Sequence, residues 1–209
     1  MQLKSLQNFF QNGLIGYYPK EEINAFFYRI CEQHLDYKRI DVSLKSETLI
    51  TPETFEYFET IISRLLTYEP IQYILGTTSF FGFEFKVDSN VLIPRPETEE
   101  LVAWILKQTD SSQSRKILDI GTGSGCIAVS LAKHLPNAEV YALDVSPAAL
   151  EMAQYNAQQN GVQIHAGKLM YWNGQLPNCS LTSSFPIRPM FGKVKKNAWR
   201  PMCWNTNRI

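Results

Sequence analysis

The spacing of apolar and polar positions divides the chain into a helical first third and a mixed second part. Apolar residues recur at helical spacing within Lys20–Gln33 and again over Pro52–Tyr68. Thr51 and the following proline form a strong helix start, because a threonine hydroxyl can cap free backbone amides and proline suits the first turn. These stripes predict a small helical bundle over residues 1–70. Its apolar faces either pack on each other or receive a partner protein.

Strand spacing follows the bundle, between residues 71 and 98. Aromatic residues alternate with smaller or polar ones at positions 81, 83 and 85. Gly82 lies between them and suits a tight turn. We therefore expect a β-hairpin that links the bundle to the remainder of the chain.

Two prolines stiffen the segment Pro94–Thr98 ahead of a helix predicted over Glu99–Lys107. Glu97 or Thr98 is expected to cap this helix. Arg95 and Glu97 have two possible roles, which the sequence leaves open. They either contact a cofactor or fix the linker against the domain that follows.

The segment Lys116–Asp144 contains a strand, a glycine-rich turn, a helix and a second strand. Lys116–Ile120 is a short apolar strand, and Cys126–Leu135 has apolar residues at helical spacing. Ala138–Leu143 is the second strand, which ends at Asp144. This order predicts a βαβ unit with a ligand site at the carboxyl ends of its strands.

The chemistry of this site follows from its residue types. Glycines allow positive φ and let a ligand approach the backbone, and the first amides of the following helix are free to bind polar groups. A carboxylate at the end of the second strand can accept hydrogen bonds from both ribose hydroxyls. The loop reads GxGxG rather than the dinucleotide fingerprint GxGxxG, and no Lys-Ser/Thr follows as a P-loop requires. The predicted cofactor-binding residues are Gly121, Thr122, Gly123, Ser124, Gly125 and Asp144.

Composition narrows the cellular context. Apolar residues make up 44% of the chain, enough for a packed core, yet no run approaches the ~18 residues of a membrane span. The N-terminal stretch has polar interruptions and does not resemble a signal peptide. The four cysteines lack the spacing of a metal site or a disulfide framework. These features predict a cytoplasmic protein without a metal or a membrane partner.

Three strings carry a resemblance to a known family. Asp-Ile-Gly-Thr-Gly-Ser-Gly closely resembles motif I of S-adenosylmethionine (SAM) methyltransferases. Glu-Pro-Ile-Gln-Tyr-Ile-Leu-Gly and Val-Leu-Ile-Pro-Arg-Pro-Glu-Thr-Glu resemble the release-factor glutamine methyltransferases, known as PrmC or HemK. The resemblance covers about residues 1–164. It implies an α/β fold, in which a Rossmann-like SAM-dependent methyltransferase domain is preceded by a small helical bundle and a β-hairpin.

The resemblance also implies an activity. Family members transfer a methyl group to the side-chain amide nitrogen of the glutamine in the Gly-Gly-Gln loop of peptide-chain release factors. The glycine loop backs the methionine part of SAM, Asp144 holds its ribose, and the bundle binds the release factor without direct contact to nucleic acid. Two alternatives remain: another protein or nucleic-acid amino group as the methyl acceptor, and a non-catalytic remnant that binds release factor or SAM.

The tail, residues 165–209, departs from the family pattern. It contains seven Lys or Arg and no Asp or Glu, and the Asn-Pro-Pro-Tyr string that holds the substrate amide in the family is missing. Read one base upstream, the codons of Met170–Trp172 require Val-Leu-Glu, and those of Ser183–Phe191 permit a string with Asn-Pro-Pro-Tyr. Our hypothesis is an out-of-frame tail starting near Val162–Lys168, which leaves the methyltransferase domain at 99–164 incomplete and without catalytic residues. The alternative is a natural basic tail that binds nucleic acid.

Overall fold

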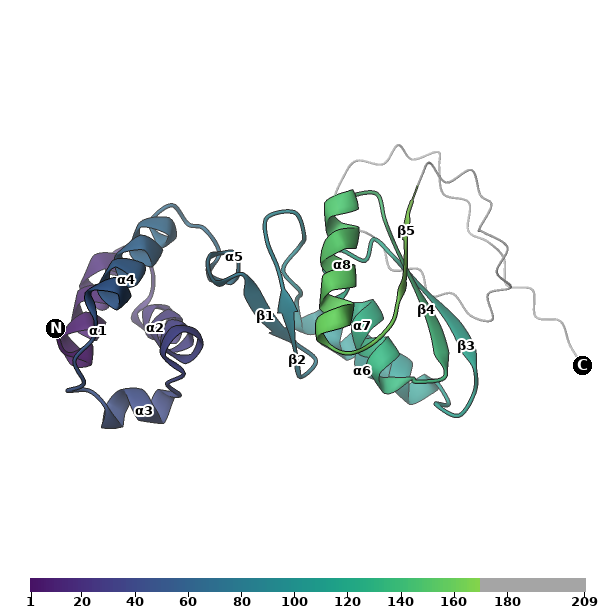
Figure 1. The fold of residues 1–209 in the computed structure, drawn as a ribbon, viewed down its shortest axis with the longest axis horizontal. Coiled ribbons are helices and arrows are strands. Elements are labelled where there is room, and N and C mark those ends of the chain that lie inside the picture. Colours follow the sequence, from purple (N-terminus) through teal and green to yellow (C-terminus); the bar gives the residue numbers. More distant parts are fainter. Residues whose placement is uncertain (170–209) are drawn as a thin grey trace, which may run out of the picture.

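The computed structural model describes residues 1–169, which form three successive parts (Figure 1). A helical bundle comes first, a short helix and a two-stranded hairpin follow, and a three-stranded sheet with its helices ends the described chain. The predicted order of bundle, hairpin and α/β domain is confirmed. The predictions for residues 170–209 lie outside the described residues.

The bundle is built around aromatic side chains from three helices. Its elements are α1 (Leu3–Leu14), α2 (Lys20–Leu35), α3 (Arg39–Leu44) and α4 (Pro52–Leu65). Phe10, Phe27 and Phe58 are fully buried, with ring centroids 5.5, 5.6 and 5.9 Å apart. The Thr51 hydroxyl accepts a hydrogen bond from the Thr54 amide at 3.2 Å, so α4 begins where the sequence predicts. The apolar stripes therefore pack on one another.

The hairpin follows a short helix that the sequence did not indicate. Helix α5 (Ile71–Leu75) leads into the antiparallel strands β1 (Thr77–Phe80) and β2 (Phe83–Lys86). Phe81 and Gly82 form the turn with φ of 50° and 81°, the left-handed pair that matches the twist of a two-residue hairpin. Phe81 therefore lies in the turn and outside the strands.

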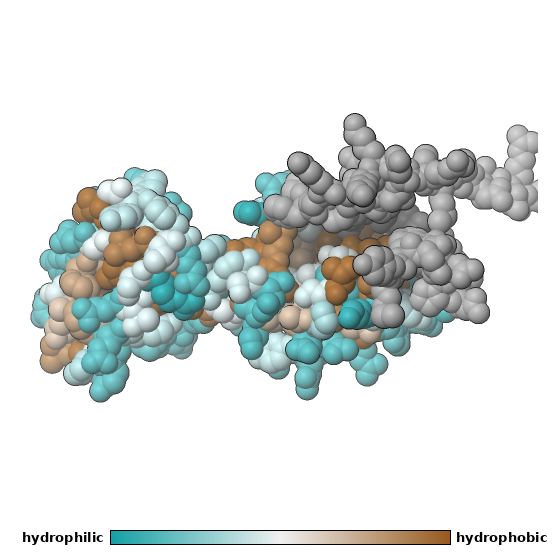
Figure 2. Space-filling view, turned by 90° about the horizontal axis from the view of Figure 1, so that it is seen from above, coloured by the Kyte–Doolittle hydropathy of each residue, from teal (hydrophilic) through white to brown (hydrophobic). Residues whose placement is uncertain are grey.

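The bundle and the second half of the molecule are two lobes joined by a narrow neck (Figure 2). Two side chains of α2 reach across this neck. The Arg29 guanidinium donates to the Thr77 carbonyl at 2.8 Å, and the Gln33 amide donates to the Leu75 carbonyl at 2.9 Å. The bundle is thus held to the start of the hairpin by hydrogen bonds to its backbone.

The sheet of the second lobe is parallel, with strand order β3-β4-β5. Its elements are α6 (Pro96–Gln108), β3 (Arg115–Ile120), α7 (Cys126–His134), β4 (Ala138–Asp144), α8 (Pro147–Gln159) and β5 (His165–Lys168). Two right-handed crossovers in the same direction place α7 and α8 on one face of the sheet (Figure 1). Strand β5 carries the sheet to Lys168, beyond the domain end at residue 164 that the sequence suggested.

The start of α6 differs from the expectation. The helix begins at Pro96, and its N-cap Arg95 makes no side-chain cap hydrogen bond, so the predicted capping by Glu97 or Thr98 is wrong. The fixed φ of proline suits the first helical position, which moves the start upstream. Glu99, within the first turn, instead accepts a hydrogen bond from the Phe81 amide at 2.8 Å and ties α6 to the hairpin turn. Arg95 and Glu97 are both exposed, and their role stays a prediction.

Candidate active site

The glycine loop lies between the end of β3 and the start of α7. Its three glycines, Gly121, Gly123 and Gly125, all have positive φ, at 78°, 54° and 79°. The Gly121 and Thr122 amides both donate to the Leu143 carbonyl of β4, at 2.7 and 3.1 Å. Alternate left-handed residues turn the chain sharply and hold the loop against the end of the neighbouring strand.

The glycines differ in what surrounds them. A Cβ added at Gly121 or Gly123 would meet no atom within 4 Å, so the backbone faces open space there. A Cβ at Gly125 would lie 2.9 Å from the Cβ and 3.0 Å from the Cα of Ala153 on α8. The first two glycines thus leave room for a ligand, whereas the third permits close packing of the loop on α8.

The two polar side chains of the loop turn inward. Thr122 and Ser124 are buried, and the Thr122 hydroxyl donates to the Asp119 carboxylate at 2.7 Å. Burial raises the pKa of the Asp119 carboxyl to about 6, while the Thr122 hydrogen bond acts in the opposite direction. Asp119 therefore stabilises the loop through its buried hydrogen bond with Thr122. The loop presents backbone rather than side chains to a ligand.

Asp144 lies at the carboxyl end of β4, opposite the loop. One carboxylate oxygen accepts from the Gly123 amide and the other from the Ser146 amide, each at 3.0 Å. A carboxylate has about four acceptor positions, so both oxygens keep capacity for further donors such as ribose hydroxyls. The structure thus brings Asp144 and the five predicted loop residues together at one edge of the sheet, as the spacing predicts.

Asn156 is a member of this region that sequence reasoning missed. Its side chain is 1% exposed and donates to the Ser124 carbonyl of the loop at 2.8 Å. The same amide group hydrogen-bonds the backbone of Lys86 in β2, 70 residues away in the chain. A polar residue on the buried face of α8, where its neighbours are alanines and a methionine, was the available signal.

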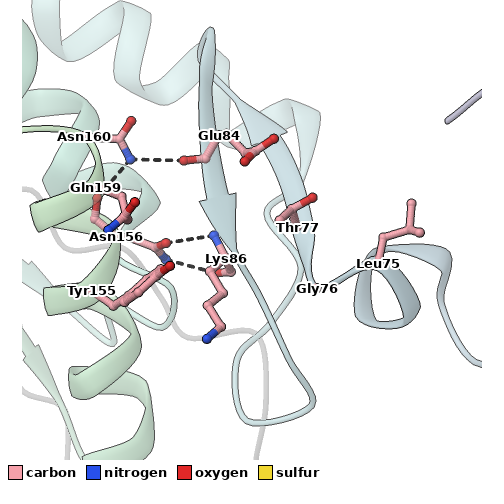
Figure 3. Close-up of a pocket in the computed structure, with 9 residues that line it drawn as sticks. All are labelled: Leu75, Gly76, Thr77, Glu84, Lys86, Tyr155, Asn156, Gln159 and Asn160. Carbon is pink, nitrogen blue, oxygen red and sulfur yellow. Dashed lines mark hydrogen bonds between the residues drawn. The ribbon is translucent and has the colours of Figure 1, made fainter. Parts of the chain in front are cut away.

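A pocket of about 400 Å³ lies between the hairpin and α8 (Figure 3). The Asn156 side chain on α8 points towards β2 across this gap, and the Nζ atom of Lys86 lies 4.7 Å from the centre of the Tyr155 ring. One turn beyond Asn156, the Asn160 amide donates to the Glu84 carbonyl at 3.0 Å. The side-chain amides of Asn156 and Asn160 therefore hold the hairpin against the helix by hydrogen bonds to the backbone of β2.

Two negative findings apply to residues 1–169. Within this range, no cluster of three or more His, Cys, Asp or Glu is placed to hold a metal ion. No helix in the same range is long and apolar enough to cross a membrane.

The fold and the loop define the class of the second lobe, which is a methyltransferase domain of the Rossmann-like, SAM-dependent class. The family model of the methyltransferase small domain matches residues 98–175. The family model of the PrmC N-terminal domain matches residues 16–76, over the helical bundle. With these two matches in this order, the chain belongs to the family of release factor glutamine methyltransferases.

Curated relatives agree with this assignment. The chain is 49% identical over 167 residues to the release factor glutamine methyltransferase of Flavobacterium psychrophilum, which covers 78% of this chain and 59% of the relative. It is 42% identical over 156 residues to that of Bacteroides thetaiotaomicron, covering 75% of this chain and 55% of the relative. The enzyme of Streptococcus pneumoniae is 40% identical over 168 residues, which is 80% of this chain and 59% of the relative. The chain therefore spans less than two thirds of the length of these relatives.

Proposed function

We propose that this protein is built to transfer a methyl group from SAM to the glutamine amide nitrogen of the Gly-Gly-Gln loop in peptide-chain release factors. The main support is the combination of a PrmC-type N-terminal domain with a methyltransferase domain in one chain. The names of the relatives add to this support. The glycine loop and Asp144 supply a site of suitable chemistry.

The described residues suit SAM at this site. The open backbone at Gly121 and Gly123 leaves room for the methionine part of the cofactor, because no side chain intervenes. The Asp144 carboxylate is anchored by two backbone amides and would accept the two ribose hydroxyls. When bound, SAM supplies an activated methyl group, and the protein holds the cofactor still while an acceptor approaches.

We further propose that the chain as written does not complete the reaction. An amide nitrogen is a poor nucleophile, so catalysis depends on holding it in line with the methyl group. The family uses Asn-Pro-Pro-Tyr for this purpose, and that string does not occur in the 209 residues. An out-of-frame reading of residues 165–209 accounts for its absence, and a single clean genomic read across codons 160–170 would decide the matter.

The experiment compares two proteins, the chain as written and a version whose downstream reading frame is restored. Each is incubated with methyl-labelled SAM and a release factor, and the labelled residue is identified by mass spectrometry. We expect label on the Gly-Gly-Gln glutamine with the restored protein only. A release factor with Gln→Asn in that motif is the matched control. Robust labelling by the chain as written would refute the proposed inactivity, and no labelling by the restored protein would refute the proposed reaction.

A second candidate is a non-catalytic protein that binds release factor. It is favoured by the intact core of the bundle in a chain that lacks the substrate clamp. Co-precipitation of a release factor by the chain as written, with and without SAM, tests this candidate.

A cytoplasmic location also stays a prediction, supported by the free thiols of the buried Cys31 and Cys126.

A further inference from the structure

Asn156 connects two segments that are far apart in the chain. Its side-chain oxygen accepts from the Lys86 amide at 2.7 Å, and its side-chain nitrogen donates to the Lys86 carbonyl at 3.0 Å. The same nitrogen donates to the Ser124 carbonyl at 2.8 Å. One side chain thus joins strand β2 of the hairpin to the glycine loop (Figure 3 shows the hairpin half of this contact).

The chemistry of this position requires a primary amide. The surrounding backbone offers one N–H donor and two carbonyl acceptors, and an asparagine side chain supplies the matching acceptor and two donors. A carboxylate has no donors, and an aliphatic side chain of the same size would leave all three backbone groups without a partner. Because Asn156 is 1% exposed, water cannot readily replace these bonds.

The hairpin end of this connection leads back to the bundle. Lys86 is the register partner of Thr77 across the β1–β2 pair. The Thr77 carbonyl in turn accepts from the Arg29 guanidinium of α2 at 2.8 Å. A continuous series of hydrogen bonds and strand pairing therefore runs from the bundle through the hairpin to the loop.

We propose that Asn156 is a positioning residue that clamps the hairpin to the glycine loop, so that the bundle and the cofactor loop are held in one arrangement. The amide fixes the Ser124 carbonyl, and with it the orientation of the loop backbone that faces the ligand. A protein that docks on the bundle then acts on the loop through the hairpin. The inference relies on the proposed function only for the identity of the cofactor and of the docking protein.

The test compares Asn156→Ala with Asn160→Ala in the full chain. Asn160 is the matched control, since its amide also holds the hairpin through the Glu84 carbonyl but makes no hydrogen bond to the loop. Hydrogen–deuterium exchange without ligand is read separately for peptides covering β2 and the loop. We expect Asn156→Ala to speed exchange in both segments and Asn160→Ala to speed it in the hairpin alone. Thermal unfolding of both variants establishes that they remain folded.

A second readout is the affinity for SAM, measured by isothermal titration. Loss of the Ser124 contact is expected to weaken SAM binding by about tenfold in Asn156→Ala, while Asn160→Ala stays close to the unsubstituted chain. Asn156→Asp, which keeps the acceptor for Lys86 but turns the donors into an oxygen, should weaken binding at least as much. A merely structural role would lower the melting temperature without this selective effect on affinity.

The outcomes separate this inference from the proposed function. The proposed clamp between hairpin and loop would be overturned if hydrogen–deuterium exchange in the loop were unchanged in a folded Asn156→Ala protein. It would also be overturned if Asn156→Ala and Asn160→Ala changed exchange in the loop equally. If the unsubstituted chain showed no affinity for SAM while Asn156→Ala still loosened both segments, the clamp would stand and the SAM site would fall. If Asn156→Ala bound SAM as tightly as the unsubstituted chain does, the SAM site would stand and the clamp would fall.

Discussion

Exchanging the second or the third glycine of the loop for alanine should have different consequences. Both Gly123→Ala and Gly125→Ala place a methyl group on a residue with positive φ, which costs about 1–2 kcal/mol. The methyl group at position 123 would enter open space, whereas the one at 125 would lie 2.9 Å from the Cβ of Ala153. The first change therefore concerns ligand binding, and the second concerns folding.

The magnitude at Gly125 follows from this contact. Carbon atoms normally approach to about 3.5–4.0 Å, so α8 would have to move away by roughly 0.6 Å or more. Ala153 is fully buried and has no flexible side chain that could turn aside. Overpacking of this kind costs about 1–3 kcal/mol, which brings the total for Gly125→Ala to about 2–5 kcal/mol of unfolding free energy. Gly123→Ala should lose only the backbone contribution of about 1–2 kcal/mol.

Two measurements on each variant separate these effects. Urea unfolding followed by circular dichroism gives the free energy of unfolding, and isothermal titration with SAM gives the affinity. We expect Gly123→Ala to lose at least about tenfold in affinity, equal to ~1.4 kcal/mol, because its methyl group occupies the approach to the backbone. Equal loss of unfolding free energy in both variants would show that contact with α8 does not govern Gly125. Unchanged affinity in Gly123→Ala would refute the placement of the ligand.

Three further predictions concern Asp144, Asp119 and the bundle core. Asp144→Asn leaves one acceptor oxygen for the two backbone amides that now donate to the carboxylate. Isothermal titration with SAM should show a loss of about 1–3 kcal/mol in binding free energy. Full affinity for SAM would contradict the role assigned to Asp144. Because burial raises the pKa of Asp119 to about 6, the folded protein holds this proton more tightly than the unfolded chain. Ionising Asp119 should therefore lower the unfolding free energy by up to about 3 kcal/mol as pH rises from about 4 to 6, with the cost absent below that window. Urea unfolding at several pH values should find this decline reduced in Asp119→Asn, and identical pH profiles would argue against it. Phe58→Ala removes a fully buried ring that meets Phe10 and Phe27 and should cost about 3–5 kcal/mol, seen as a lower melting temperature of the bundle in calorimetry. An unchanged melting temperature would mean that this ring cluster does not hold the bundle together.

Local patterns in the sequence were sufficient for most of the elements, although not for helix α5 or strand β5, and for the glycine loop and Asp144 of the candidate site. The strand before the glycines, the left-handed turn and the acid ending the second strand each depend on residues within a short window. Parallel pairing of β3 with β4 then brings Asp144 beside the loop without further information, because parallel strands end at the same edge. The family strings also lie within such windows, so family membership could be predicted from them.

Only the tertiary structure decided which distant residues meet. The contacts of Asn156 with Ser124 and Lys86 span 32 and 70 residues, and no periodicity within α8 points to those partners. Glu99 was expected as the first residue of its helix, yet the helix starts at Pro96, and the Glu99 carboxylate reaches the hairpin turn at Phe81. Local spacing sets which face of an element is buried, whereas the packing of three separate elements sets which backbone groups a buried amide can reach.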